Sequence, residues 1–590
     1  MHGSTIWPAG IPTPTDPRIA AALDAWVTAA EPNNPAGALA AVVTLVARAG
    51  TRGVTPDVGL VVDGRRVDPS PAVLAAPIDG DLLGLADAGP WLPGFLREAL
   101  LSVDSRRWGG VHHTSPAMAA TLVDLVAAAR SFGPSDVIVD PAVGGGVFLL
   151  AACEALEGDR ADRIRQVRGL DIDPLAIATA EASLRLWAGG AELPAGALRV
   201  GDALDGEWPF DDATIVIGNP PFRSQLRDGT ARDAGRRSAM AERWPELRGY
   251  VDDAAAFLLA GVDHVDDGGV VALVQPSSFL SARDAEPVRR RLTTAAAPIG
   301  LWLDGGRQFS AAVDTVALLV RKGAVGTSVL RSRGVPAQTL AAHAAVDEGS
   351  WASLLLADAP TIDRSLVGSG VALREVAHVT AGFRDQFYGL RGAVAENVVG
   401  QPKLITSGLI DPLDCRWGVV SCRFDKQRWS APTVDPARVD PSIQGWVADR
   451  LVPKLLVASQ TRVIEVILDP AGDMVPCTPV VTIEPSVGAP SLAHLAAALT
   501  APVVSLMLLN EAAGSALSAD AMRVSAAALG ALPLPAEGRE WDAAAAAVAA
   551  LSAAPDPEEL LEIGRLAMEA YGLGERTDIV DWWYSRRRGR

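Results

Sequence analysis

Residues 219–222, with the sequence NPPF, have the types and spacing to hold and activate an amino group. The side-chain oxygen of Asn219 and the carbonyl oxygen of Pro220 can both accept hydrogen bonds from an amine. Two such acceptors would localise a lone pair that is otherwise delocalised into an aromatic ring. Pro220 and Pro221 stiffen the backbone, so that the acceptors are fixed before the amine arrives. Phe222 offers a flat face for a base, and such stacking is worth about 1 to 3 kcal/mol in single-strand binders.

A second stretch, residues 140–150 with the sequence DPAVGGGVFLL, predicts a loop that binds a nucleotide cofactor. It follows the apolar run 137–139 and leads into the helix-compatible segment 148–156, which gives the order strand, glycine turn, helix. The three glycines allow a tight turn and a close approach to a ligand. The amide groups at the start of the following helix can face a carboxylate or a phosphate.

Polar residues also end two further strand-like runs. Asp171 follows residues 167–170, and Asp202 follows the segment LRVG. An acid at the tip of the second strand can accept hydrogen bonds from the ribose hydroxyls of a cofactor that lies across the strand ends. Either acid alone could equally well cap the following helix. Because Asn219 ends the fourth strand, the set as a whole favours one ligand site along one edge of a sheet.

The elements that position these residues alternate between strand and helix over residues 85–323. This pattern predicts a mostly parallel sheet covered on both faces. The apolar runs 137–139, 215–217, 270–274 and 316–320 suit buried strands. The fold class we expect is therefore α/β, with a Rossmann-like domain, a small N-terminal helical region and a C-terminal α+β domain.

The two motifs together resemble those of a known family. DPAVGGGVFLL is similar to the cofactor motif, and NPPF to the catalytic motif, of class I methyltransferases that use S-adenosylmethionine, specifically gamma-class DNA methyltransferases that act on amino groups. The upstream segment GVHHTSPAMAATLVDLV resembles the N-terminal motif of that class, which has an HYTP core. Segments between residues 252 and 323 resemble the later sheet motifs in order and spacing. The resemblance covers residues 85–323.

The resemblance implies a role for each matching residue. The catalytic motif is Asn219, Pro220, Pro221 and Phe222. The cofactor would be S-adenosylmethionine, with His113 and Thr114 beside its methionine end, Asp140, Ala142, Gly144 and Gly146 in the loop around its methionine part, Asp171 on its ribose and Asp202 on its adenine amine. The sequence departs from the family where HHTSP replaces HYTP and where Val143 and Gly145 replace the usual Cys and Ser. Neither departure removes a charged group or an acceptor, so we expect cofactor binding to survive.

The reaction implied is methyl transfer to the N6 amine of an adenine that has been flipped out of duplex DNA. NPPF favours adenine, while the N4 amine of cytosine stays open as a target. We expect a modification enzyme of a restriction-modification or phage-defence system, with any nuclease, helicase or specificity subunit on another chain. Two alternatives remain, an RNA or protein-glutamine methyltransferase and a catalytically silent DNA-binding subunit. The size of the C-terminal region argues against the first, and the intact motifs argue against the second.

A DNA enzyme needs local positive charge, since the chain carries a formal net charge of −18. The segment after NPPF is rich in arginine and would lie over the catalytic cleft, although it could also be a solvated polar loop. The C-terminal region resembles the target-recognition region of gamma-class enzymes. The candidate DNA contacts are Arg223, Arg227, Arg236 and Arg237 after the motif, together with Arg384, Gln386, Tyr388, Lys403, Lys454 and Arg462 in the C-terminal region.

At 590 residues the chain is too long for one core. We expect an N-terminal helical region (1–84), the methyltransferase domain (85–323), a linker with a short helix at 340–345 (324–370), the target-recognition domain (371–540) and a helical tail (541–590). The N-terminal region should contain helices at 17–30 and 36–49 and a hairpin at 58–67 that turns at Asp63 and Gly64. The four cysteines show no CxxC pair, so we expect no metal site and a reducing compartment. No signal peptide or membrane span is expected, which indicates the cytoplasm.

Overall fold

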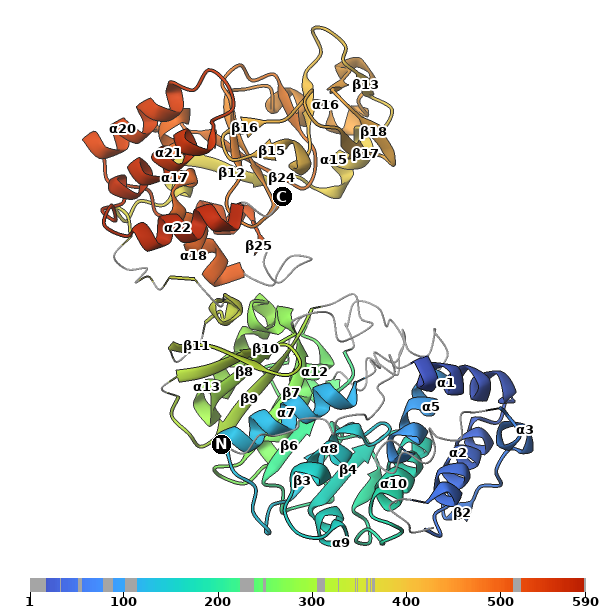
Figure 1. Cartoon of the computed structure of the whole chain (residues 1–590). Helices are drawn as coiled ribbons and strands as arrows, with labels where there is room; N and C mark the ends of the chain where they lie inside the picture. Colours follow the sequence, from blue (N-terminus) through green and yellow to red (C-terminus); the bar gives the residue numbers. More distant parts are fainter. Residues whose placement is uncertain are drawn as a thin grey trace. The chain divides into compact units, whose positions relative to one another are not determined.

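The computed structural model describes residues 17–31, 33–50, 56–77, 89–100, 114–222, 238–247, 251–304, 314–326, 328–344, 346, 349–356, 359–360, 362, 367–512 and 522–587. The chain forms two compact units, Met1–Gly349 and Ser350–Arg590 (Figure 1). Each unit has apolar clusters of its own.

The first unit is built on a nine-stranded sheet with the order β11-β10-β8-β9-β7-β6-β3-β4-β5. The strands β5, β4, β3, β6 and β7 run parallel, whereas β9 is antiparallel to both β7 and β8. The strands are β3 (Ile138–Asp140), β4 (Val167–Asp171), β5 (Leu198–Val200), β6 (Ile215–Gly218), β7 (Val270–Pro276), β8 (Ala296–Leu303), β9 (Thr315–Lys322), β10 (Ser328–Arg333) and β11 (Gln338–Ala344). The prediction of an α/β domain with a mostly parallel sheet is confirmed.

Helices flank this sheet, as Figure 1 shows. They are α7 (Pro116–Ala129), α8 (Val147–Ala155), α10 (Pro174–Trp187), α12 (Asp253–His264) and α13 (Glu286–Ala295). The interior strands read as continuous apolar runs because both faces are covered, and every residue of β6 and β7 is buried.

The N-terminal region packs onto the same unit through α10 and shares its apolar cluster. It contains α1 (Pro17–Ala29), α2 (Pro35–Ala49), α3 (Pro71–Leu74), the 3-10 helix η1 (Gly89–Trp91) and α5 (Leu92–Leu100). The predicted hairpin is present as β1 (Val61–Val62) and β2 (Arg65–Arg66). Its turn residues Asp63 and Gly64 have φ of 48° and 75°, the conformation that a two-residue hairpin turn requires.

The expected linker 324–370 needs correction, because its first part belongs to the sheet. β10 pairs in parallel with β8, and β11 pairs with β10, so the sheet continues to residue 344. The helix expected at 340–345 is wrong, since residues 338–344 form β11. Alanine gives this segment a local preference for helix, but pairing along the edge of the sheet outweighs it.

The second unit is α+β, as predicted. One sheet has the order β12-β24-β20-β22 and another the order β13-β19-β14-β23. Their strands are β12 (Ala377–Ala381), β24 (Val480–Pro485), β20 (Lys454–Ala458), β22 (Val466–Asp469), β13 (Val394–Glu396), β19 (Pro432–Val434), β14 (Lys403–Ile405) and β23 (Met474–Pro476). Three small hairpin-like pairs complete it: β15 (Ile410–Asp411) with β16 (Asp414–Cys415), β17 (Cys422–Phe424) with β18 (Gln427–Trp429), and β21 (Gln460–Thr461) with β25 (Met522–Arg523).

The helices of this unit are α14 (Leu373–Val376), α15 (Arg384–Gly389), α16 (Gln444–Asp449), α17 (Leu492–Thr500), α18 (Pro502–Ala512), α19 (Ala526–Gly530), α20 (Arg539–Ala549), α21 (Pro557–Ala570) and α22 (Thr577–Arg587). The last three pack against α17 and α18, so the expected tail is part of the unit. Trp583 is fully buried, and a Cβ on Gly564 would lie 3.3 Å from its ring. The C-terminal tryptophans are therefore packed core residues.

No single helix among the described residues is long and apolar enough to cross a membrane. Two consecutive helices joined at a bend, Leu492–Thr500 and Pro502–Glu511, are long and apolar enough only when they are taken together.

Candidate active site

Four predicted polar residues meet at one cavity, at the carboxyl ends of the parallel strands of the first unit. Asp140 ends β3, Asp171 ends β4, Asp202 follows β5 and Asn219 follows β6. All four line a cavity of about 280 Å³. Parallel strands bring their carboxyl ends to one edge of the sheet, which is why residues distant in sequence meet there.

The glycine loop wraps around the first of these acids. Gly144 and Gly146 have φ of 51° and 87°, which other residues adopt only with strain. The Oδ1 atom of Asp140 accepts a hydrogen bond from the backbone N–H of Ala142 at 3.0 Å. A Cβ on Gly218, at the end of β6, would lie 2.5 Å from the same Oδ1 atom. The buried carboxyl group therefore needs glycine at the end of the neighbouring strand.

The second acid is held by the loop and does not cap a helix. Asp171 accepts hydrogen bonds from the N–H groups of Gly144 and Asp173, both at 2.9 Å. The N-cap of α10 is Asp173, whose side chain accepts from the N–H of Leu175. Asp202 accepts from the N–H of Leu204 at 3.0 Å and is followed by turns and bends. The helix-capping alternative therefore fails for both acids.

Burial changes the titration of two of these acids. Desolvation raises the pKa of Asp140 to about 8, and the nearby carboxylate of Asp171 contributes in the same direction. Burial also raises the pKa of Asp171. A ligand that brings hydrogen-bond donors or positive charge would stabilise both carboxylates.

The catalytic motif adjoins the acids. The Nδ2 atom of Asn219 donates a hydrogen bond to Oγ1 of Thr114 at 3.0 Å. With the amide assigned this way, its carbonyl oxygen is the end that can accept a hydrogen bond. Pro221 lines the cavity, and Phe222 is half-buried against the apolar cluster of the unit. His113 lies outside the described residues, whereas Thr114 lines the same cavity and is 6% exposed.

One wall of the cavity comes from α5, which the sequence did not single out. This helix contributes Gly94, Phe95, Arg97 and Glu98, and Trp91 of η1 precedes them. Arg97 is 7% exposed and forms an ion pair with Asp173 at 2.6 Å. A Cβ on Gly145 would lie 2.7 Å from the Cα of Gly94, so the helix and the glycine loop touch through two glycines. That glycine pair was the only signal of this contact, and it is too common to have been recognised.

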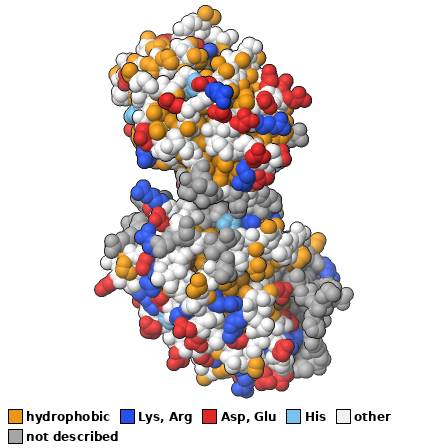
Figure 2. Space-filling model, turned by 90° about the vertical axis from the view of Figure 1, so that its left-hand side faces the viewer, with side chains coloured by type: hydrophobic (Ala, Val, Ile, Leu, Met, Phe, Trp, Pro, Cys, Tyr) orange, Lys and Arg blue, Asp and Glu red, His pale blue; other side chains and the backbone are white. Residues whose placement is uncertain are grey.

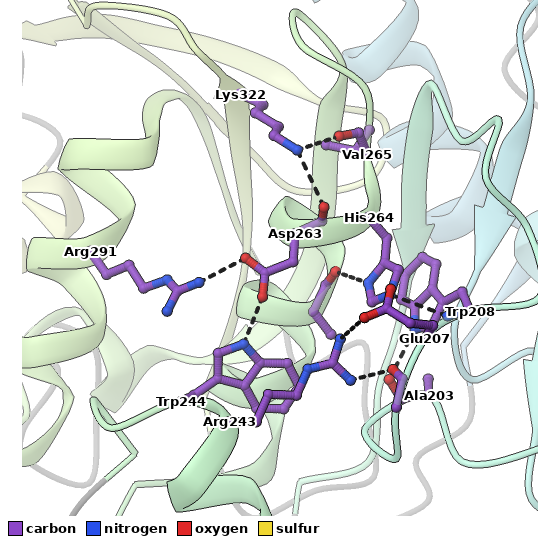
Figure 3. Close-up of polar contacts among 12 residues, drawn as sticks. Ala203, Glu207, Trp208, Arg243, Trp244, Asp263, His264, Val265, Arg291 and Lys322 are labelled. Atoms are coloured by element: carbon purple, nitrogen blue, oxygen red, sulfur yellow. Dashed lines mark hydrogen bonds and ion pairs between the residues drawn. The ribbon is translucent and has the colours of Figure 1, made fainter.

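The chain downstream of the motif is anchored by the polar cluster in Figure 3. The fully buried Trp244 donates from Nε1 to Asp263 at 2.8 Å, and Arg291 donates to the other oxygen of Asp263 at 2.8 Å. Lys322 donates to the carbonyl of Val265 at 2.7 Å, near the end of α12. The bond from Trp244 fixes residues 238–247 against α12, and the other two bonds join α13 and β9 to the end of the same helix.

A second part of the cluster is built around His264, whose Nε2 lies 3.2 Å from the carboxylate of Glu207. His264 stacks on Trp208 with ring centroids 4.5 Å apart (Figure 3). Its Nδ1 lies 2.8 Å from the carbonyl oxygen of Ala260, and its Nε2 accepts from the N–H of Trp208. Arg243, a member of the arginine-rich set, lies over Trp244, donates to the carbonyl of Gly206 and forms an ion pair with Glu207 at 3.8 Å. Arg243 is thus explained by structural contacts.

The predicted DNA contacts have different outcomes. Arg223, Arg227, Arg236 and Arg237 lie outside the described residues, as does the side chain of Arg384. Lys403 is half-buried and forms an ion pair with Asp473 at 3.0 Å. The prediction for Lys454 is wrong, because its side chain is fully buried and ion-paired with Asp469 on the neighbouring strand β22. A fully buried ammonium group cannot contact a phosphate.

The order of the strands, the antiparallel β9 and the position of the cavity define the fold of class I methyltransferases. Residues 100–298 match the family model of the N-6 DNA methylases. The resemblance to gamma-class N6-adenine DNA methyltransferases is thereby confirmed.

One solved structure extends the likeness of fold over both units. The type IIL restriction-modification enzyme MmeI, solved in complex with DNA, is 12% identical with a TM-score of 0.58, over 94% of this chain and 90% of that one. The type IIG restriction endonuclease BpuSI is 13% identical with a TM-score of 0.45, over 96% of this chain and 80% of that one. A type I methyltransferase subunit from Streptococcus thermophilus is 18% identical with a TM-score of 0.35, over 45% and 56%. No curated protein matches the chain.

Proposed function

We propose that the chain is a site-specific DNA methyltransferase that transfers a methyl group from S-adenosylmethionine to the N6 amine of adenine in duplex DNA. The observation that carries this proposal is the position of Asn219. It lies at the end of β6, on the same cavity as the three acids at the ends of β3, β4 and β5. Methyl transfer to nitrogen needs a hydrogen-bond acceptor that holds the target amine beside the cofactor cavity.

The chemistry of the cavity lining fits the proposed cofactor. Asp171 and Asp202 present carboxylates to hydroxyl or amino groups, and Ile172 is 57% exposed at the cavity as an apolar surface for a base. Gly144 and Gly145 line the cavity with backbone alone, whereas a Cβ on Gly146 would lie 3.2 Å from Ala180 of α10, away from the cavity lining. When bound, S-adenosylmethionine supplies an activated methyl group on a sulfonium. The residues of the chain then have to position its acceptor.

The catalytic task of this chain is therefore alignment and hydrogen bonding. Asn219 and the carbonyl group of Pro220 accept hydrogen bonds from the target amine and draw its lone pair out of the ring. Thr114 fixes the amide of Asn219 in the required orientation. Alignment of this kind can account for roughly 7 to 11 kcal/mol of barrier in well-oriented systems. No side chain with a matched pKa is needed, because the amine loses its proton only after it has been methylated.

The target base has to leave the duplex to reach the cavity, so we include base flipping in the proposal. The second unit would select the DNA sequence, in keeping with a likeness of fold to MmeI that extends over both units. We further propose a restriction-modification system as the setting, since that is the setting of MmeI. Arg384, Lys403 and the arginines between residues 223 and 237 stay proposed DNA contacts.

The test is methylome sequencing of a methylation-deficient bacterial host that expresses the native chain, Asn219→Ala or the control Asn510→Ala. Asn510 lies in α18 of the second unit. We expect one methylated adenine motif with the native chain and the control, and none with Asn219→Ala, while all three purified chains bind S-adenosylmethionine. Methylated cytosine at N4, or cofactor binding with methylation of RNA or protein only, would contradict the proposal.

A further inference from the structure

The hairpin β17–β18 of the second unit has one face in the core and the other in solvent. On the inner face, Phe424 is 3% exposed within an apolar cluster, and Trp429 packs against that cluster. Nε1 of Trp429 donates to the carbonyl of Phe424 at 3.3 Å. On the outer face, Arg423 and Arg428 lie directly opposite each other, and both are exposed. The hairpin is thus held in place by side chains other than its arginines.

The two arginines are placed where they oppose folding. Residues directly opposite on an antiparallel pair have Cβ atoms about 4.5 to 5.5 Å apart, and like charges there destabilise the pair. Within the part of the chain that the structure describes, neither Arg423, Arg428 nor the nearby Lys426 forms an ion pair. No described residue therefore compensates this repulsion, and an anion bound between the side chains would do so.

The turn of the hairpin keeps a third cation at a position that suits glycine. Asp425 and Lys426 have φ of 45° and 65°. Two-residue turns with positive φ at both positions usually contain Asn-Gly or Asp-Gly. Asp425 tolerates this conformation and forms an ion pair with Arg391 at 2.6 Å. Lys426 has no such support, and strained residues of this kind are concentrated at binding sites.

Aromatic side chains of α15 lie beside the turn of the hairpin. Figure 1 shows β17 and β18 next to α15, and the ring of Phe387 in α15 lies 5.0 Å from that of Phe424. The guanidinium of Arg391 lies over the ring of Tyr388 at 5.1 Å, and Tyr388 is 50% exposed. The ion pair of Arg391 with Asp425 joins this ring to the turn that carries Lys426. An exposed aromatic ring beside a cationic hairpin suits nucleic acid better than an acidic protein surface, because nucleic acid combines phosphates with flat bases.

We propose that this hairpin surface, formed by Arg423, Lys426 and Arg428, binds the backbone phosphates of duplex DNA. The inference rests on the proposed function and assigns a DNA contact to residues that the sequence did not suggest. A two-stranded β-ribbon fits the major groove of B-DNA, which is about 12 Å wide. Arginine can also bind a phosphate through two parallel hydrogen bonds. In a chain with a net charge of −18, such contacts have to come from local clusters of this kind.

The test measures how the affinity of the full chain for a mixed-sequence DNA duplex depends on salt. Each phosphate contact contributes about 0.9 to the slope of log K against log salt concentration, so Arg423→Gln/Arg428→Gln should lower the slope by about 1.8. The matched control is Arg539→Gln/Arg565→Gln, which removes the same charge from exposed sites on α20 and α21, at the far end of the unit from the hairpin (Figure 1). We expect the slope of the control to equal that of the native chain.

Two further variants separate binding from folding. Arg423→Lys/Arg428→Lys keeps both charges and should keep the slope. Lys426→Gly relieves the strained turn, so it should raise the melting temperature while it lowers the slope by about 0.9. The inference would be overturned if Arg423→Gln/Arg428→Gln and the control had equal slopes on duplex DNA. It would also be overturned if Arg423→Gln/Arg428→Gln lowered the slope only on single-stranded RNA. A native chain that binds no duplex DNA would overturn the proposed function itself.

Discussion

Asp140 is a buried acid whose pKa gives the unliganded protein a specific dependence on pH. Burial raises this pKa to about 8, whereas an unfolded aspartate titrates near 3.9. The folded chain therefore holds a proton that the unfolded chain releases. This bound proton contributes fully to the free energy of unfolding below pH about 4. The contribution is lost as pH rises toward about 8, and the free energy of unfolding falls by at most about 1.4 kcal/mol per pH unit.

Asp140→Asn removes this titration and keeps an oxygen that can accept from the N–H of Ala142. We expect the variant to gain stability relative to the native chain as pH rises from 5 to about 8, and the difference to stay constant above that. Urea unfolding in the absence of cofactor at several pH values measures this. The exposed Asp205→Asn serves as the control for removal of one charge. A difference from Asp140→Asn that does not change with pH would show that the site holds a carboxylate throughout.

Single residues differ in how well the sequence predicts them. Asp171 and Asn219 were placed correctly because each follows an apolar run, and parallel strands bring such ends together. Lys454 was wrongly predicted to contact DNA, because lysine is almost always exposed. Its ion pair with Asp469 depends on the register of β20 and β22, which places the two residues opposite each other. No local pattern contains that register.

The element that most needs a test is α5, which forms one wall of the cavity. It meets the glycine loop through Gly94 and Gly145, and a Cβ on Gly145 would lie 2.7 Å from the backbone of Gly94. Gly145→Ala should therefore push α5 away from the loop. We expect its Kd for S-adenosylmethionine, measured by calorimetry, to rise at least about tenfold, which corresponds to about 1.4 kcal/mol.

The control for this variant is Gly189→Ala, at a glycine with φ of 68° and open space around the Cβ position. It should lose stability through backbone strain of about 1 to 2 kcal/mol and bind the cofactor normally. Unchanged cofactor binding by Gly145→Ala would mean that α5 is not part of the binding site.

The sequence predicted elements well where the signal is local. The interior strands are continuous apolar runs, and α1, α2 and the β1–β2 hairpin lie where their patterns indicate. The role of α5 was missed because its packing depends on a contact with a loop about fifty residues away in sequence. β11 was read as helix because an alanine-rich edge strand has no pattern of its own and forms only through pairing with β10.

For the molecule as a whole, the structure moves the end of the catalytic unit from the expected residue 323 to residue 349. β10 and β11 complete the sheet beside β8. The buried Arg289 also donates from Nε to the carbonyl of Gly349 at 2.8 Å and from NH1 to that of Phe279 at 2.7 Å. A fragment that stops at 323 would lose the carbonyl group of Gly349 as the acceptor for Arg289. It would also leave β8 as an unpaired edge strand, which favours aggregation.

We therefore expect residues 1–349, expressed alone, to unfold cooperatively and to bind S-adenosylmethionine with the Kd of the full chain, because the unit has its own apolar cluster. Residues 1–323 should aggregate or melt at a lower temperature. The longer fragment should methylate no specific DNA sequence, since the proposed recognition unit, Ser350–Arg590, is absent. Thermal unfolding and calorimetry on both fragments measure the first two expectations, and methylome sequencing measures the third. If the fragment that ends at 323 were as stable as the one that ends at 349, β10 and β11 would have to be an accessory edge and not part of the catalytic fold.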